Sequence, residues 1–155
     1  MGRILSEQEL LAAVADDRRA GRTIALANGC FDVLHVGHAR YLQASAAEAD
    51  RLVVAINDDA SVRRLKGEGR PVMPEAERAE LVAALRGVAY VVVFGGPTVG
   101  PLLEAVQPDV HCKGTDYTVD SVPERDVVRR YGGRTAIVGD PKDHSTRGLI
   151  AKIKG

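Results

Sequence analysis

The chain has no tryptophan and only two phenylalanines and four tyrosines, so it has few rings on which nucleic-acid bases could stack. Its 21 basic and 21 acidic residues cancel, which leaves no overall field to attract a nucleic acid or an acidic membrane. No apolar run approaches the roughly 18 residues of a membrane span, and the start, MGRILSEQELL, has acidic residues where a signal peptide is apolar. We therefore expect a cytoplasmic protein with neither a nucleic-acid nor a membrane partner.

Cysteine is also scarce. Cys30 and Cys112 lie far apart and outside any metal-binding spacing, which indicates neither a disulfide framework nor a zinc site. A chain of 155 residues can bury a core without such links, and no repeat or low-complexity linker divides it. We predict one domain over 1–155, with an N-terminal helix within 1–22 and an α/β core over 23–155.

Short apolar runs alternate with helix-forming segments along the chain. The predicted strands are 23–29, 51–57, 88–94, 109–114 and 134–139. The predicted helices are 6–20, 38–50, 74–87, 97–106, about 123–131 and from about 145 onward. Strands that are apolar throughout and alternate with helices are typical of a parallel sheet covered on both faces. The pattern predicts an α/β fold: a single doubly wound, Rossmann-like domain with about five parallel strands.

The connection over 58–73 is rich in charge and glycine and is predicted to lack regular structure. In doubly wound folds the ligand crevice lies beyond the carboxyl ends of the strands. The segments that follow the predicted strands are 28–38, 57–58, 94–95, 113–116 and 140–147. We expect the functional site among them.

The first of these segments, NGCFDVLHVGH, has two histidines three residues apart at a predicted helix start. Helix N-termini bind anions through their N–H groups, so His35 and His38 could donate hydrogen bonds to a phosphate there. Gly37 between them would let the backbone approach the ligand. The alternative is that one histidine caps the helix and the other is packed.

Other segments add candidate phosphate ligands. Ser145 and Thr146 in HSTRGLI suit either a second phosphate cradle or an ordinary helix cap. The basic residues of the 58–73 connection could equally be a solvated surface; they are Arg63, Arg64, Lys66 and Arg70. Lys113 ends a buried strand, where a lysine needs an anion or solvent.

Several other chemistries lack their motifs. The chain has no G-x-G-x-x-G after its first predicted strand, no Walker lysine and no G-x-S-x-G elbow. Asp32, His35 and His38 could ligate a metal, but they lack the spacing of known metal motifs, so we expect no tight protein-bound metal.

With these residues in view, the chain resembles the nucleotidylyltransferase superfamily defined by an H-x-G-H motif. The segments NGCFDVLHVGHARYLQ, VAINDDASVRRLKGEGRPVMPEAERAELVAAL and KGTDY are most similar to the heptose 1-phosphate adenylyltransferases of that superfamily. The resemblance implies transfer of AMP from ATP to D-glycero-β-D-manno-heptose 1-phosphate, giving ADP-heptose and pyrophosphate. A sugar-phosphate oxygen would attack the α-phosphorus in line, without a covalent enzyme intermediate.

The resemblance also implies residue roles, carried over by motif match. The implied catalytic residues are His35, His38 and Lys66. The implied nucleotide-binding residues are Asn28, Gly29, Cys30, Phe31, Asp32, Gly37, Lys113, Asp116, Ser145, Thr146 and Arg147. The implied sugar-phosphate-binding residues are Asn57, Asp58, Arg64, Lys66 and Arg78. It further implies a homodimer and Mg²⁺ that arrives on the triphosphate, because Mg²⁺ prefers phosphate and water oxygens.

Two positions depart from the family pattern. The family's KGGDY is KGTDY here, so Thr115 places a Cβ where glycine could bring the backbone against a ligand. Arg147 replaces the second threonine of Ser-Thr-Thr and resembles other adenylyltransferases of the superfamily. These departures leave two alternatives open, a glycerol-3-phosphate or related cytidylyltransferase and a nucleotide-binding regulatory domain without turnover.

Overall fold

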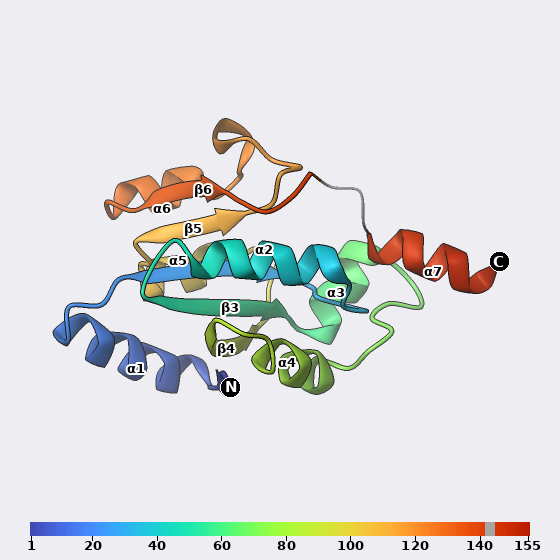
Figure 1. The fold of residues 1–155 in the computed structure, drawn as a ribbon, viewed down its shortest axis with the longest axis horizontal. Helices are drawn as coiled ribbons and strands as arrows, with labels where there is room; N and C mark the ends of the chain where they lie inside the picture. The colour runs from blue at the N-terminus through green and yellow to red at the C-terminus, as the bar shows by residue number, and fades with distance from the viewer. Residues whose placement is uncertain (142–144) are drawn as a thin grey trace.

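A computed structural model describes residues 1–141 and 145–155 and shows one six-stranded sheet in which all neighbouring strands are parallel. The order across the sheet is β1-β4-β3-β2-β5-β6 (Figure 1). The strands are β1 Arg3–Ile4, β2 Ile24–Gly29, β3 Arg51–Asn57, β4 Val88–Phe94, β5 Val110–Lys113 and β6 Arg134–Ile137. The five predicted strands are present and the α/β class is confirmed. The sequence predicted about five strands and the sheet has six, because β1 is a two-residue exposed edge strand that has no apolar run.

The helices follow the predicted alternation. They are α1 Glu7–Arg19, α2 Val36–Ala46, α3 Asp59–Lys66, α4 Glu75–Ala83, α5 Gly100–Val106, α6 Arg125–Arg130 and α7 Thr146–Lys154, with a 3₁₀ turn η1 at Val119–Ser121. Helix α3 corrects the prediction that 58–73 lacks regular structure. Asp58 caps it by accepting the Ser61 N–H at 2.8 Å, and its buried Val62 anchors it.

Helices cover both faces of the sheet, which makes the domain doubly wound. Residues such as Ala25 and Ala27 of β2 pack into one core with Leu42 of α2 and Val82 of α4. The alternate β2 residues, Ile24 and Leu26, face a second core on the other side of the sheet. They share it with Leu10 and Val14 of α1 and with Leu102 and Leu103 of α5. Because both faces are apolar, functional polar groups are confined to the strand ends and loops.

Strands β2 and β5 mark the point where the order of the sheet reverses, and they separate at their carboxyl ends. Their pairing ends at Ala27 and Cys112. At this point the Tyr41 hydroxyl donates to the Cys112 carbonyl at 2.6 Å. Such a switch point is where doubly wound folds form their ligand crevice.

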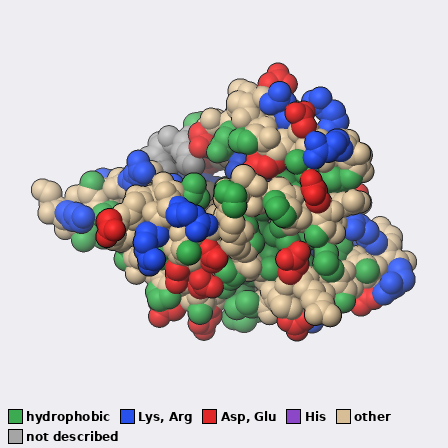
Figure 2. All heavy atoms as spheres, turned by 180° about the vertical axis from the view of Figure 1, so that it is seen from behind, with side chains coloured by type: hydrophobic (Ala, Val, Ile, Leu, Met, Phe, Trp, Pro, Cys, Tyr) green, Lys and Arg blue, Asp and Glu red, His purple; other side chains and the backbone are tan. Residues whose placement is uncertain are grey.

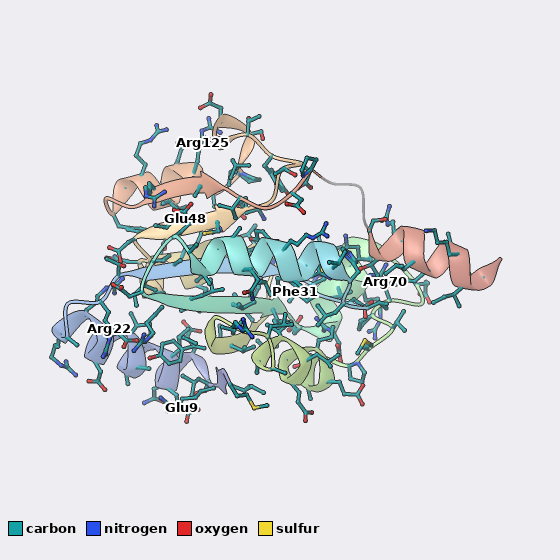
Figure 3. The ribbon with its side chains drawn as sticks, viewed as in Figure 1. Glu9, Arg22, Phe31, Glu48, Arg70 and Arg125 are labelled. Carbon is teal, nitrogen blue, oxygen red and sulfur yellow. The ribbon has the colours of Figure 1, made fainter. Side chains whose placement is uncertain are left out.

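Basic and acidic side chains are intermixed on the face drawn in Figure 2. None of the helices formed by the described residues is both long and apolar enough to cross a membrane. Helix α7 projects from the carboxyl end of the sheet, and Phe31 and Arg70 lie at that same end (Figures 1 and 3).

Candidate active site

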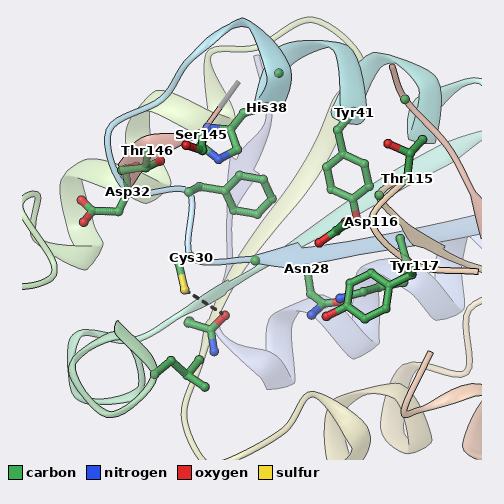
Figure 4. Close-up of a pocket in the computed structure, with 18 of the residues that line it drawn as sticks. Asn28, Cys30, Asp32, His38, Tyr41, Thr115, Asp116, Tyr117, Ser145 and Thr146 are labelled. Carbon is green, nitrogen blue, oxygen red and sulfur yellow. Dashed lines mark hydrogen bonds between the residues drawn. The ribbon is translucent and has the colours of Figure 1, made fainter. Parts of the chain in front are cut away.

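A cavity of about 570 Å³ opens at the carboxyl ends of the strands, within the size range of small-molecule sites. It brings together most of the predicted site residues, several of which Figure 4 shows. The predicted residues that line it are Asn28, Gly29, Cys30, Phe31, Asp32, His35, Gly37, His38, Asn57, Lys66, Lys113, Asp116, Ser145, Thr146 and Arg147. The predicted residues outside it are Asp58, Arg64 and Arg78.

The two histidines are fixed by the start of α2. His35 is the N-cap residue, and its Nδ1 accepts the Gly37 N–H at 3.1 Å. The His35 N–H in turn donates to Nδ1 of His38 at 3.3 Å. Both Nδ1 atoms are acceptors, so each neutral ring carries its proton on Nε2. The cap and phosphate interpretations are therefore compatible, because capping uses Nδ1 whereas each ring carries its proton on Nε2.

The histidine rings are stacked, with centroids 3.9 Å apart and an interplanar angle of 23°. Two imidazolium ions at this distance would repel each other, and the positive end of the α2 dipole would add to that penalty. The geometry thus favours neutral rings that act as hydrogen-bond donors.

The loop before α2 has an uncommon backbone. Phe31 and Val33 have φ angles of 50° and 53°, in the left-handed region that non-glycine residues rarely occupy. The ring of Phe31 is 3% exposed and packs edge-on against His38 at 5.4 Å between centroids. A Cβ on Gly29 would lie 3.1 Å from this ring, so a larger residue there would require the ring to shift by a few tenths of an ångström. The loop stores strain where the histidines must be aimed, a common property of functional sites.

Asp32 lines the cavity, but its carboxylate is engaged elsewhere. Its side chain is 0% exposed and accepts hydrogen bonds from Arg70 Nε at 2.7 Å and from the N–H groups of Val72 and Met73 at 2.9 and 3.0 Å. Burial would raise the pKa of this carboxyl, but these donors outweigh burial and lower it. In Figure 4 the carboxylate points away from the ring of His38. Asp32 therefore holds the 70–73 segment in place.

Arg78, predicted to bind the sugar phosphate, is instead a buried link between strand ends. Its guanidinium is 0% exposed and donates to the carbonyls of Cys30 and Asn57, both at 2.7 Å, and of Met73 at 2.9 Å. It also pairs with Asp59 at 2.8 Å. The Nε, Nη1 and Nη2 atoms are all engaged inside the protein, so Arg78 shapes the cavity from behind.

Of the predicted acceptor-binding residues on α3, only Lys66 lines the cavity. Asp58 is the N-cap of the helix, and the Arg64 guanidinium donates to the Ser61 hydroxyl at 3.4 Å; neither residue lines the cavity. Lys66, in the last turn, lines the cavity together with Arg70. The basic segment is thus divided between the site and the surface.

The Cys30 thiol lies in the cavity with its sulfur 3.9 Å from Asn57 Oδ1 (Figure 4). Burial raises the pKa of this thiol, which keeps it protonated at neutral pH. It is therefore poorly suited to act as a nucleophile.

Helix α7 supplies the remaining wall. Ser145 caps it by accepting the Gly148 N–H at 2.9 Å, and the Thr146 hydroxyl donates to the Asp32 carbonyl at 2.7 Å. The cap interpretation of Ser145 is therefore confirmed. Part of the predicted 140–147 segment, residues 142–144 with His144 of the HSTRGLI motif, lies outside the described residues.

Sequence reasoning missed several residues of the cavity wall. Arg40 pairs with Asp140 at 3.0 Å at the rim, and the Thr115 hydroxyl donates to the Asp140 carbonyl at 2.8 Å. Lys113 Nζ lies 4.7 Å from the centre of the Tyr117 ring, a cation–π distance. Tyr41 could have been found, since it lies one helical turn after His38 and shares its face. Thr115 was noted as a departure from the family pattern, but its loop-joining role was not visible.

Within the described part of the chain, no three His, Cys, Asp or Glu side chains are grouped as a metal site. The cavity instead combines cationic groups with neutral imidazole donors. This arrangement suits an anionic ligand with several phosphate groups.

Comparison with known proteins places this geometry in a family. The family model described as cytidylyltransferase-like matches residues 26–149. The "Bifunctional protein HldE" of Ectopseudomonas mendocina is 47% identical over 151 residues, and that of Alcanivorax borkumensis is 44% identical; each match covers 97% of this chain. The chain spans about a third of the length of these relatives, 32% in both cases.

Two solved structures are similar. The lipopolysaccharide core biosynthesis protein from Thermoplasma volcanium has a TM-score of 0.68 and 25% identity, covering 79% of this chain and 100% of that one. The pantothenate synthetase from Thermus thermophilus has a TM-score of 0.65 and 18% identity, covering 95% of this chain and 64% of that one, which shows a shared fold. With the family match over most of its length, the chain belongs to the cytidylyltransferase-like family.

Proposed function

We propose that the chain is a nucleotidyltransferase that transfers AMP from ATP to D-glycero-β-D-manno-heptose 1-phosphate, releasing ADP-heptose and pyrophosphate. The observation that carries this proposal is the stacked His35–His38 pair, whose Nδ1 atoms accept backbone N–H groups at the start of α2. The high identity to two HldE proteins over 97% of the chain supports the acceptor. So does the fold shared with a lipopolysaccharide core biosynthesis protein.

In the proposed reaction an oxygen of the acceptor phosphate attacks the α-phosphorus of ATP. A new P–O bond forms, the bond from the α-phosphorus to the bridging oxygen breaks, and pyrophosphate leaves with the electron pair. The Nε2–H groups of His35 and His38 would stabilise charge on the phosphate oxygens as this happens. Such transfers depend on positioning and charge stabilisation, which a preorganised pair of donors provides.

Other cavity residues receive roles in the same proposal. Lys66, with Arg70 beside it, would bind the acceptor phosphate at the end of α3. The hydroxyls of Ser145 and Thr146 already serve the α7 cap and the Asp32 carbonyl, so the N-terminus of α7 and Arg147 would hold the terminal phosphates.

The nucleoside would lie between β2 and β5, beside Lys113 and Asp116. Mg²⁺ would enter as part of the ATP complex. We also propose that residues 1–155 act as one nucleotidyltransferase domain and that the protein is cytoplasmic. We propose further that it is a homodimer, and light scattering would test this by measuring its molar mass.

The test is a panel of the four nucleoside triphosphates against several phosphorylated acceptors, followed by pyrophosphate release. We expect the highest kcat/KM for ATP with the heptose 1-phosphate. Preference for CTP with a small alcohol phosphate would replace the proposal with a cytidylyltransferase. Nucleotide binding without pyrophosphate release from any pair would indicate a regulatory domain.

A further inference from the structure

A buried histidine that the proposed reaction does not use lies behind the cavity. His111, in β5, is 0% exposed, and in the sheet it is in register with Leu26 of β2 and Thr135 of β6. Its Nε2 is 2.8 Å from Oδ1 of Asn28, the residue of β2 that lines the cavity at the switch point. The pair connects the apolar core to the ligand site.

The environment of the other ring nitrogen selects the orientation of this pair. Nδ1 of His111 is buried and has no hydrogen-bond partner among the described residues. If Nε2 carries the proton and donates to Asn28 Oδ1, Nδ1 is a buried acceptor to which no described residue donates. The reverse arrangement would bury an N–H donor with nothing to accept from it, and orphaned donors are the rarer defect in proteins. Burial, with the charge of Lys113, lowers the pKa of His111 to about 3, so the ring is neutral at assay pH.

This orientation leaves one polar group of Asn28 for a ligand. Its side-chain oxygen accepts from His111. No hydrogen bond joins the Asn28 Nδ2 group to any described residue, and Asn28 is only partly buried. The amide is therefore held through its oxygen by His111, and its two N–H donors remain for the cavity that Asn28 lines.

The place of Asn28 in the cavity indicates which part of a nucleotide it would meet. Figure 4 shows Asn28 beside Tyr117, while Ser145 and Thr146 lie with His38 at the other end. Tyr41 and Asp116 lie on the Asn28 side of the same view. The phosphate-binding groups are thus at one end and Asn28 at the other.

We propose that His111 is a positioning residue that fixes the Asn28 amide so that its NH₂ group donates to an acceptor atom on the nucleoside part of the nucleotide. The inference rests on the proposed function for its ligand. It predicts that His111 affects nucleotide affinity through Asn28, without touching the nucleotide.

Steady-state kinetics of pyrophosphate release test the coupling. We expect His111→Leu and Asn28→Ala each to raise the KM for the nucleotide about 3- to 10-fold, the range that one lost hydrogen bond gives, with the sugar-phosphate KM within about twofold of wild type. The double variant should be no worse than the poorer single variant, because the two act as one unit. His111→Gln, which retains an N–H donor, should recover part of the loss.

A core variant separates positioning from destabilisation. Leu103→Val removes a methylene from the same buried core and should lower the unfolding midpoint while leaving the nucleotide KM unchanged. Equal effects of His111→Leu on both KM values, or additive effects in the double variant, would overturn the proposal.

Nitrogen NMR of the His111 ring gives a readout that does not need turnover. We expect a protonated Nε2, a bare Nδ1 and no titration between about pH 5 and 8. A proton on Nδ1 or a midpoint near the ordinary histidine value of about 6.5 would refute the orientation. If no substrate pair turns over, the proposed function fails, and calorimetric nucleotide affinities of the same variants still test the His111–Asn28 pair.

Discussion

Replacing Asp32 with asparagine removes a buried charge while keeping the shape of the side chain. Three donors converge on this carboxylate: Arg70 Nε and the N–H groups of Val72 and Met73, at 2.7 to 3.0 Å. The side chains of Asp32 and Arg70 are 0% and 11% exposed. In the Asp32→Asn variant the amide oxygen could accept from one or two of these donors, but Arg70 would be left as a nearly buried cation.

The expected cost follows from that geometry. Removing one partner of a buried ion pair typically destabilises a protein by about 3–5 kcal/mol. The retained amide oxygen and the small exposure of Arg70 reduce this, so we expect a loss of roughly 2–4 kcal/mol in the free energy of unfolding. Because domains are stable by about 5–15 kcal/mol, the variant should still fold. Urea denaturation measures the loss as a lower midpoint.

The pH dependence provides an independent check. The pKa of the Asp32 carboxyl is lowered in the folded protein, so its contribution is complete above the ordinary carboxyl pKa, about 3.9, and disappears as pH falls through the folded value. The difference in stability between wild type and Asp32→Asn should be constant from about pH 8 to about pH 5 and should narrow below about pH 4.

Asp126→Asn is the matched control. Asp126 and Arg129 form a 3.9 Å pair with both side chains mostly exposed, and such pairs contribute about 1 kcal/mol or less. The Asp32 variant should also raise the KM for the sugar phosphate more than that for ATP, because the 70–73 segment carries Arg70 into the site. If Asp32→Asn costs no more than Asp126→Asn, the carboxylate does not hold the segment and our interpretation of Asp32 is wrong.

Three further substitutions test the other assignments. His38→Ala should lower the kcat of pyrophosphate release by roughly 100-fold or more, while stability falls by only about 1 kcal/mol for the lost His35 N–H hydrogen bond, and near-normal turnover would contradict the phosphate site. Lys66→Ala should raise the KM for the sugar phosphate more than that for ATP; the reverse ranking would move Lys66 to the nucleotide pocket. Arg78→Met should cost roughly 3–5 kcal/mol in urea denaturation, because it leaves the Met73, Cys30 and Asn57 carbonyls without their donor, whereas a wild-type midpoint would refute the bridging role.

Much of the fold could be predicted because each main strand is a continuous apolar run. Burial on both faces of the sheet makes β2 and β3 apolar throughout, and that pattern is visible in the sequence alone. Strand β1 gave no such signal, since two exposed edge residues need no apolar side chains. Helix α3 was hidden because its charged residues face solvent and it is only eight residues long.

The site was predictable where its residues share one loop. His35, Gly37 and His38 follow one strand directly, so their proximity could be inferred from spacing. The roles of Asp32 and Arg78 could not, because their partners are distant in sequence: Arg70 is 38 residues from Asp32, and Cys30 is 48 residues from Arg78. A motif match shows that a charged residue is retained near a site, but not whether its charge faces the ligand or the protein interior.

The two walls of the cavity differ in how deeply the contacts that hold them are buried. The wall after β2 and β3 is held by the buried Arg78 and Asp32 networks, whose disruption costs several kcal/mol. The links across the rim after β5 and β6 include the Arg40–Asp140 pair, with side chains 51% and 54% exposed, and the Thr115 hydroxyl bond to Asp140. An exposed pair of this kind contributes about 1 kcal/mol or less. Among the described residues, the contacts across the Thr115–Asp140 rim are therefore weaker than those that hold the wall behind His35 and His38.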